Sequence, residues 1–346
     1  MFSKDVLLQK MLSAKHYMSY CVQLAQMGRT LTNPRVGCII VYQNAIIGEG
    51  YHQEFGKAHA ERNAFNAVKP EDKHLIKDSD VYITLEPCTF YGKTPACTDL
   101  FKQFPCKRVF IGLKDVNPKV AGKGIQKLKN LGIEVILGVE KEQCAQLIRP
   151  FTHGMKNKKP YTIAKWAESF DGFIALPNKR TAITNDLINL KTQVWRSQFD
   201  AYLIGKKTLE IDEPKLNSRV LEEQQPLRVI LGNHINLNNS FFNLNLKTVL
   251  CGQNKSSEKY ITRIPSSDIL KILETLYKEY NIGSLVVEGG SYTIQQFLDK
   301  NQVQEIRRII NPKLKLNEGV NAPQFSKFNL VKSETYRGEI IEYWQK

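Results

Sequence analysis

The sequence contains no apolar segment long enough to cross a membrane. A transmembrane helix needs roughly 18 or more consecutive apolar residues, and no such run is present. The N-terminal segment MFSKDVLLQKML is broken by charges and lacks the apolar region of a secretory signal. Internal repeats and low-complexity tracts are also absent. We therefore expect a cytoplasmic protein that has no membrane partner.

Cysteine is sparse, and acidic residues are outnumbered by basic ones. The seven cysteines follow no regular spacing, which argues against a disulfide framework and for a reducing compartment. Lys and Arg total 49 against 34 Asp and Glu, giving a formal net charge of +15. The basic residues are scattered, apart from a short run at Lys156, Lys158 and Lys159. This distribution favours a generally basic surface with phosphate sites over a nucleic-acid partner.

A chain of 346 residues is long for one hydrophobic core and sufficient for two. Strand-length apolar runs alternate with segments of helical periodicity, which is typical of an α/β layer fold. The predicted strands are Val36–Val41, Ala45–Gly50, Val81–Leu85, Val109–Leu113, Ile133–Leu137, Tyr161–Ala167, Ala201–Ile204, Leu227–Leu231 and Ser284–Val287. The predicted helices are Met18–Ala25, His59–Val68, Ile125–Leu131, Asp186–Ser197 and Ile269–Tyr280. We expect domains at residues 1–150 and 151–346, with the polar segment 153–160 as a linker or an exposed crossing.

One histidine and two cysteines form the pattern with the clearest chemistry. HAE at residues 59–61 is followed by EPC at residues 86–88 and then by Cys97. An imidazole and two thiolates suit Zn²⁺ with one open coordination position. We therefore expect His59, Cys88 and Cys97 to bind zinc, which lowers the pKa of a water in the open position. The pattern is the signature of zinc-dependent nucleobase deaminases.

Glu61 lies two residues after the histidine, at an expected helix start. It is placed to take a proton from that water and pass it to a ring nitrogen and then to the leaving amine. We also expect Pro87 to open a helix whose N-terminus keeps the thiolates of Cys88 and Cys97 deprotonated. The alternative interpretation is a pair of core cysteines and a surface His–Glu pair.

The remaining cysteines have no such partners in the sequence. We expect them to be core or half-exposed thiols, as free cysteines usually are. They are Cys21, Cys38, Cys106, Cys144 and Cys251.

The spacing of the two zinc cysteines indicates which family of zinc-dependent deaminases the chain resembles. Eight residues separate them, in CTFYGKTPAC, where deaminases of nucleic acids and free nucleosides usually have two. With NPRVGCIIV (33–41), GEGYHQ (48–53), TLEPC and NPKVAGKG (117–124), the chain resembles the deaminase half of the bifunctional riboflavin-biosynthesis deaminase/reductases. The resemblance implies a cytidine-deaminase-like three-layer domain.

The same resemblance implies four residues that contact the deaminase substrate. Asn33 and His52 match the family's asparagine and histidine of the two early segments. Lys93 and Thr94, in the loop between the cysteines, are expected at the ribose-phosphate end, where a lysine suits a phosphate. At Phe90 the family usually has a histidine, so the loop contacts differ here.

Residues 160–346 are similar to the reductase half of the same enzymes, which implies a C-terminal dihydrofolate-reductase-like domain. The matching segments are PYTIAKWAESFDGFIA (160–175), WRSQFDAYLIGKKTLEIDEPKLNSR (195–219) and VVEGGSYTIQQFL (286–298). From the residues alone, Gly289–Gly290 follows an apolar strand and precedes a helix that starts at Ser291. Such a turn lets the backbone approach a pyrophosphate at a helix N-terminus. An arginine at 219 could bind a phosphate through two hydrogen bonds.

The resemblance also implies two ligand sets in this domain. The set expected to bind NADPH is Ala167, Thr208, Asp212, Asn233, Gly290, Ser291, Tyr292, Thr293, Ile294, Gln295 and Gln296. The set expected to bind the reductase substrate is Arg196, Leu216, Arg219 and Glu288. Taken singly, the two arginines would be ordinary surface residues. The family's tryptophan before the Ile–Thr pair is missing, because Ile183–Thr184 is preceded by Arg180, Thr181 and Ala182.

We therefore expect a bifunctional enzyme of riboflavin biosynthesis. Its first domain would deaminate 2,5-diamino-6-ribosylamino-4(3H)-pyrimidinone 5′-phosphate, and its second would reduce the ribosyl group to ribityl with NADPH. A homo-oligomer, a dimer or a tetramer, is expected. One rival is a nucleic-acid deaminase with an accessory domain, favoured only by the net charge. The other is a zinc-stabilised binding protein, although a structural zinc usually has four protein ligands and only three are at hand.

Overall fold

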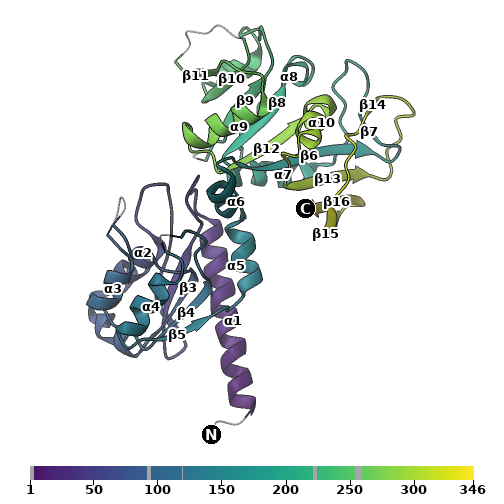
Figure 1. Ribbon diagram of the computed structural model, residues 1–346. Helices are drawn as coiled ribbons and strands as arrows, with labels where there is room; N and C mark the ends of the chain where they lie inside the picture. The colour runs from purple at the N-terminus through teal and green to yellow at the C-terminus, as the bar shows by residue number, and fades with distance from the viewer. Residues whose placement is uncertain (1–3, 92–94, 119, 221–223, 254–258) are drawn as a thin grey trace. The chain divides into compact units, whose positions relative to one another are not determined.

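The computed structural model describes residues 4–91, 95–118, 120–220, 224–253 and 259–346. Its contacts divide the chain into two compact units, Met1–Lys156 and Asn157–Lys346 (Figure 1). The division falls six residues beyond the expected boundary at residue 150. None of the described helices is both long and apolar enough to cross a membrane.

The first unit is built on a five-stranded sheet of order β2-β1-β3-β4-β5. The strands are β1 (Gly37–Tyr42), β2 (Ala45–Tyr51), β3 (Asp80–Leu85), β4 (Arg108–Leu113) and β5 (Glu134–Leu137). β1 pairs antiparallel with β2 and β3, and β3, β4 and β5 are parallel. Gln43 and Asn44 form the turn between β1 and β2, and both have positive φ angles.

Helices cover both faces of this sheet. The helices are α1 (Lys4–Gln26), α2 (Ala60–Ala67), α3 (Thr98–Gln103), α4 (Lys123–Asn130), α5 (Lys141–Leu147) and α6 (Arg149–Asn157), with a 3-10 helix η1 (Pro70–Asp78). Side chains alternate between the faces of a strand, so Ile40 of β1 packs in the cluster of α2, α3 and α4 while Ile39 packs with α1 and α5. The ribbon shows these two helical layers on either side of the sheet (Figure 1). The expected three-layer fold is confirmed.

The second unit holds a nine-stranded sheet of order β11-β10-β9-β8-β12-β6-β13-β16-β15. Its strands are β6 (Tyr161–Ser169), β8 (Ala201–Gly205), β9 (Leu227–Leu231), β10 (Thr248–Cys251), β11 (Ile261–Ile264), β12 (Ser284–Gly289), β13 (Glu305–Asn311), β15 (Asn329–Tyr336) and β16 (Glu339–Gln345). The strands from β11 to β13 are parallel, and β16 and β15 complete one edge antiparallel. β7 (Phe173–Ala175) and β14 (Val320–Asn321) form a separate pair. This mainly parallel sheet agrees with the expected reductase-like fold.

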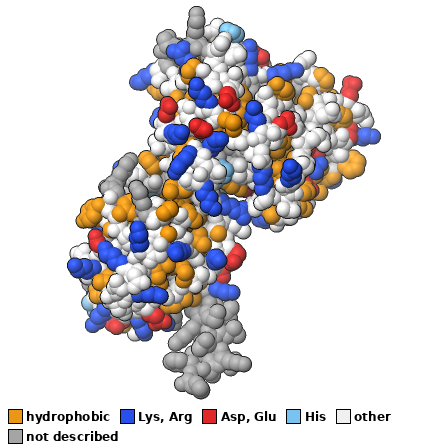
Figure 2. Space-filling view, in the orientation of Figure 1, with side chains coloured by type: hydrophobic (Ala, Val, Ile, Leu, Met, Phe, Trp, Pro, Cys, Tyr) orange, Lys and Arg blue, Asp and Glu red, His pale blue; other side chains and the backbone are white. Residues whose placement is uncertain are grey.

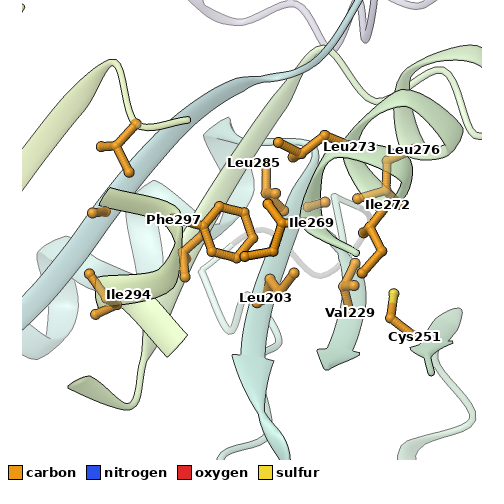
Figure 3. Close-up of a cluster of buried hydrophobic side chains, with 14 of the residues drawn as sticks. Leu203, Val229, Cys251, Ile269, Ile272, Leu273, Leu276, Leu285, Ile294 and Phe297 are labelled. Atoms are coloured by element: carbon orange, nitrogen blue, oxygen red, sulfur yellow. The ribbon is translucent and has the colours of Figure 1, made fainter. Parts of the chain in front are cut away.

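Helices cover the second sheet as well. They are α7 (Asp186–Gln198), α8 (Lys206–Asp212), α9 (Ile269–Lys278) and α10 (Ser291–Asp299), with a 3-10 helix η2 (Ser240–Leu244). Ile272 of α9 and Phe297 of α10 pack on Leu203 and Leu285 of the central strands (Figure 3). A second cluster, containing Tyr202, occupies the other face.

The segment 153–160, expected as a linker or an exposed crossing, contains the division between the two units, but most of it is helical. Helix α6 continues to Asn157, so only the last three residues of that segment precede β6. Pro150 lies in the first turn of α6, where a missing N–H costs little, and Pro160 lies beyond its end. The polar composition of the segment reflects the exposed side of a helix.

Asp200 connects the starts of β8 and β12 in the second unit. Its side chain is buried, and its Oδ2 accepts hydrogen bonds from the Gly283 N–H at 3.0 Å and the Ser284 N–H at 2.9 Å. The Ser284 hydroxyl donates to the same oxygen at 3.0 Å. A buried carboxylate with three donors is a strong local constraint, because removing it leaves the amides without a partner.

We expect Asp200→Ala to destabilise the second unit by about 2–3 kcal/mol, the cost of orphaned buried donors. Asp200→Asn should lose less, because its amide oxygen still accepts hydrogen bonds. The three tryptophans, Trp166, Trp195 and Trp344, all lie in the second unit, so tryptophan fluorescence during urea unfolding reports on this unit in the whole chain. Equal midpoints for Asp200→Ala and for the exposed control Asp299→Ala would contradict the assignment.

Candidate active site

The three expected zinc ligands converge from three separate segments of the first unit. His59 is the residue before α2, Cys88 follows β3, and Cys97 is the residue before α3. His59 Nδ1 lies 3.2 Å from Cys97 Sγ and 3.6 Å from Cys88 Sγ. The three ligand atoms all lie within 4.8 Å of one another.

These separations fit a zinc ion. Bond lengths of about 2.3 Å to sulfur and 2.0 Å to nitrogen at tetrahedral angles place nitrogen and sulfur about 3.5 Å apart. The two observed nitrogen–sulfur distances, 3.2 and 3.6 Å, lie on either side of that value. Two thiols and an imidazole are also the ligand chemistry that zinc prefers. The geometry favours a metal site over the alternative of unrelated core cysteines.

The expected helix after Pro87 is wrong. The described residues after Pro87 are irregular as far as Tyr91, and α3 begins only at Thr98. Cys97 alone therefore lies at a helix N-terminus, and its backbone N–H donates to Cys88 Sγ at 3.3 Å. Hydrogen bonds from Cys97 and His59 lower the pKa of Cys88 to about 4, against the opposing effect of burial. The thiolate is thus stabilised by direct hydrogen bonds rather than by a helix of its own.

Glu61 lies in the first turn of α2 and is buried. Burial raises the pKa of its carboxyl group, and the nearby His59 opposes that shift. The residue also lines a cavity of about 280 Å³ next to the candidate metal site. Two of the four expected substrate contacts, Asn33 and His52, line the same cavity, and Phe90 lines it as well. Lys93 and Thr94 lie outside the described residues.

The hydrogen bonds of His52 determine how Asn33 is presented. His52 Nδ1 lies 3.0 Å from the Ala58 carbonyl, which can only accept, so Nδ1 carries the proton. Burial lowers the pKa of His52, and in the neutral ring Nε2 is an acceptor. Asn33 Nδ2 lies 3.2 Å from Nε2 and is the donor. The amide oxygen of Asn33 is therefore available to a ligand in the cavity.

Two carboxylates near the cavity were not identified from the sequence. Glu86 is buried and accepts backbone N–H bonds from Asp115 at 3.2 Å, Gly122 at 2.9 Å and Ile125 at 3.1 Å. It therefore holds the 115–125 segment against the start of the zinc loop. Asp115 lines the cavity, and burial raises its pKa to about 6. The LEPC segment contains Glu86, but its role depends on contacts with a distant segment.

The five cysteines without a predicted ligand role are all buried and free, which confirms the expectation of core thiols. They pack among apolar side chains of both units: Cys21, Cys38, Cys106, Cys144 and Cys251.

The second unit contains a larger cavity, of about 820 Å³, at the carboxyl ends of its parallel strands. Basic side chains contribute to its wall, among them Lys165, Lys206 and Lys207, which suits phosphorylated ligands. Trp166 of β6 also lines it. The expected cofactor or substrate residues that line this cavity are Ala167, Thr208, Asp212, Asn233, Glu288, Gly290, Ser291, Tyr292, Thr293 and Gln296.

Two glycines, Gly205 and Gly290, allow close packing at the start of α10. A Cβ on Gly290 would lie 3.1 Å from Thr208 Oγ1, and a Cβ on Gly205 would lie 2.3 Å from Thr293 Oγ1. Glycine at both positions thus lets β8, β12 and the two following helices approach closely. Helix α10, with its N-terminal N–H groups, begins at Ser291 in the cavity wall, an arrangement that favours a pyrophosphate.

Five expected residues are not among the lining residues, and Arg196, which pairs with Glu288, is one of them. Ile294 is fully buried in the core (Figure 3), and Leu216 is buried in the second cluster. Gln295 donates to Asp299 at 2.8 Å. Arg219 is exposed, and its backbone N–H donates to Gln193 at 3.2 Å. A ligand role for these residues stays a prediction.

Glu288 forms ion pairs with two cations in this site. Arg196 Nη2 lies 3.0 Å from one carboxylate oxygen, and Lys165 Nζ lies 3.0 Å from the other. Burial alone would raise the pKa of Glu288, but these two cations lower it to about 2. Arg196 is thus connected to the cavity through Glu288. Lys165 was not identified from the sequence, because its partner lies on a strand far along the chain.

The loop without the family's tryptophan also lines the second cavity. Arg180 and Ala182 belong to its wall. Burial raises the pKa of the Asp212 carboxyl group, and the positive charge of Arg180 opposes that shift. In the loop where the resemblance implies a tryptophan, this chain has an exposed arginine, Arg180, and the methyl group of Ala182.

Comparison with known proteins agrees with this description. Residues 160–340 match the RibD C-terminal domain, and residues 11–113 match the cytidine and deoxycytidylate deaminase zinc-binding region. The riboflavin biosynthesis protein RibD of Actinobacillus pleuropneumoniae is 35% identical over 328 residues, covering 86% of this chain and 83% of the relative. RibD of Aquifex aeolicus is 34% identical over 343 residues, covering 95% of each chain.

Solved structures show the same likeness over the whole chain. The diaminohydroxyphosphoribosylaminopyrimidine deaminase/5-amino-6-(5-phosphoribosylamino)uracil reductase of Thermotoga maritima has a TM-score of 0.88 at 30% identity, covering 97% of this chain and 99% of its own. Acinetobacter baumannii RibD has a TM-score of 0.85 at 28% identity with the same coverage. The deaminase and reductase domains imply hydrolase and oxidoreductase activities, with zinc and NADPH as cofactors. The chain belongs to the RibD family of bifunctional riboflavin-biosynthesis enzymes, with a zinc-binding deaminase domain and a reductase domain.

Proposed function

We propose that the chain deaminates 2,5-diamino-6-ribosylamino-4(3H)-pyrimidinone 5′-phosphate and then reduces the ribosyl group of the product to ribityl. The convergence of His59, Cys88 and Cys97 beside the buried Glu61 carries the first half of this proposal. The second half is supported by the larger cavity with its basic wall and glycine turn. We assign deamination to residues 1–156 and reduction to residues 157–346, following the compact units.

Glu61 moves the protons of the deamination step. When bound by His59, Cys88 and Cys97, zinc is a Lewis acid that makes water nucleophilic near neutral pH. The Glu61 carboxylate takes one proton from the attacking water and delivers it to the pyrimidine ring nitrogen as the C–O bond forms. It then carries the second proton of that water to the amine, so that the C–N bond breaks and ammonia leaves. The amide oxygen of Asn33, oriented by His52, accepts a hydrogen bond from the substrate. Lys93 and Thr94 remain the proposed contacts for the ribose-phosphate end.

The second unit orients a cofactor and a sugar for reduction. When bound, NADPH supplies the hydride. The N-terminus of α10 and the Gly289–Gly290 turn bind its pyrophosphate, and Thr208 and Asp212 contact the cofactor. Glu288 and its two cations lie where they can orient the ribosylamino substrate. We retain Arg219, with Leu216, as proposed substrate contacts, and Arg219 as the proposed phosphate ligand.

The proposed function also bears on the binding partners and the cellular location of the protein. We propose a cytoplasmic homo-oligomer, a dimer or a tetramer, that binds small phosphorylated substrates and no nucleic acid. On the face in view, Lys and Arg side chains are spread over both units with Asp and Glu among them (Figure 2). A dispersed basic surface supports small anionic substrates better than a nucleic-acid track.

The whole proposal is tested by one assay. Purified protein with zinc, the diaminopyrimidine phosphate and NADPH should release ammonia and oxidise NADPH in equal amounts. Ammonia release without NADPH oxidation would contradict the reductase half, and no ammonia release would contradict the deaminase half.

Replacing either metal cysteine should remove zinc and deamination together. We expect about one zinc per chain in the native protein and little in Cys88→Ser or Cys97→Ser, as measured by elemental analysis. Cys106→Ser, a buried cysteine of the same unit, is the matched control and should keep its zinc. Full zinc occupancy in both ligand variants would overturn the assignment.

Glu61→Gln should separate metal binding from chemistry. The amide is nearly isosteric but cannot accept the proton, so zinc should stay while deamination falls by roughly 10² to 10⁴-fold. Pre-deaminated substrate given to the same variant should restore NADPH oxidation, which shows that the chain is folded. A native rate of ammonia release would rule out the proton-transfer role.

Glu288→Gln should impair only the reductase. Its loss leaves Lys165 and Arg196 without a counter-charge in a buried site, and we expect the reductase kcat/KM to fall by about 10²-fold. Because the pKa of Glu288 is lowered to about 2, it stays ionised as pH falls, and the native reductase rate should show no titration of this group between about pH 5 and 8. Glu334→Gln, which breaks an ion pair with Lys191, is the control. Equal reductase losses in the two variants would contradict a role in the site.

A further inference from the structure

The deaminase cavity has a wall residue on the helix that leads out of the first unit. Phe151 lines the cavity and belongs to α6, the helix labelled near the centre of Figure 1. Helix α6 ends at Asn157, and β6 of the second unit begins at Tyr161. The sequence boundary expected at residue 150 would have assigned Phe151 to the reductase domain.

Three phenylalanines line this cavity, and Phe151 is the one of them that belongs to a core cluster of the described residues. It packs against the cluster that contains the buried residues of α2, α3 and α4. Phe90, by contrast, is 41% exposed, and neither it nor Phe55 belongs to the described core clusters. A ring fixed before the ligand arrives loses little conformational entropy on binding.

The polar and apolar parts of the wall have different tasks. Asn33, Glu61 and Asp115 supply hydrogen-bonding groups, which can contact the edge of a planar heterocycle but not its face. At about 280 Å³ the cavity is near the lower limit for ligand sites, a size suited to one small ring system. A ring buried there needs an apolar surface against its face, and an aromatic side chain provides the largest one.

We propose that Phe151 is a substrate-contacting, specificity-determining residue of the deamination step, and that its ring packs against the pyrimidine. This inference rests on the proposed function. The binding site of the first reaction is therefore completed by the helix that connects the two units. The Phe151 ring contacts the pyrimidine equally in the bound substrate and in the transition state. The contact therefore contributes to substrate binding more than to the chemical step.

The test uses the full chain with zinc and the diaminopyrimidine phosphate. Phe151→Ala should raise the deamination KM by about tenfold, with kcat changed by less than about threefold. Phe151→Tyr keeps the ring and should stay within about threefold of the native KM. Phe104→Ala is the matched control, because Phe104 packs against the same cluster and does not belong to the described cavity wall.

The outcomes distinguish a wrong assignment of Phe151 from a wrong assignment of the deaminase function. Zinc content and NADPH oxidation with pre-deaminated substrate, measured for every variant, show that both units are folded. No ammonia release by the native chain would refute the proposed function itself. Native deamination with the same KM in Phe151→Ala and Phe104→Ala would refute only the role of Phe151, as would an equal loss in Phe151→Tyr and Phe151→Ala.

Discussion

The common edge at which parallel strands end determines where both candidate sites lie. In the first unit β3 and β4 end side by side, so Glu86 and Cys88 follow one strand while Asp115 follows the next. In the second unit β8, β9 and β12 end around the larger cavity. Loops at this edge can vary without disturbing the sheet. Two different chemistries therefore rest on the same geometric rule.

Buried carboxylates hold these edges together, and each is stabilised differently. Among the described residues, the hydrogen bonds to the Glu86 carboxylate come from backbone N–H groups of one loop. Glu288 is instead paired with side-chain cations and lines a cavity. A carboxylate satisfied by backbone is a structural element, because its donors cannot leave. A carboxylate paired with side-chain cations beside a cavity, as Glu288 is, is suited to contact a ligand.

The sequence predicted what depends on local pattern. The zinc residues, the glycine turn and the hydrophobic periodicity of the main strands and helices all have short-range signals, and the structure contains them. The roles of Glu86 and Lys165 were not predicted, because their partners lie far along the chain. The expected helix after Pro87 failed since proline at a helix start is permitted but not required. The strands β13 and β15 were not predicted, because their residues do not alternate regularly between apolar and polar. β13 contains Arg307 and Arg308 side by side, and most residues of β15 are exposed.

The position of Trp166 makes intrinsic tryptophan fluorescence a probe of the second cavity. Trp166 is one of the residues that line the cavity assigned to the cofactor, and its side chain is buried in the adjoining core cluster. Reduced nicotinamide absorbs light in the range where tryptophan emits. Excitation energy can therefore pass from this indole to a bound dinucleotide without any added dye. Because the first unit contains no tryptophan, that signal carries little contribution from events at the zinc site. Occupancy of one of the two centres can be followed while the other is turning over.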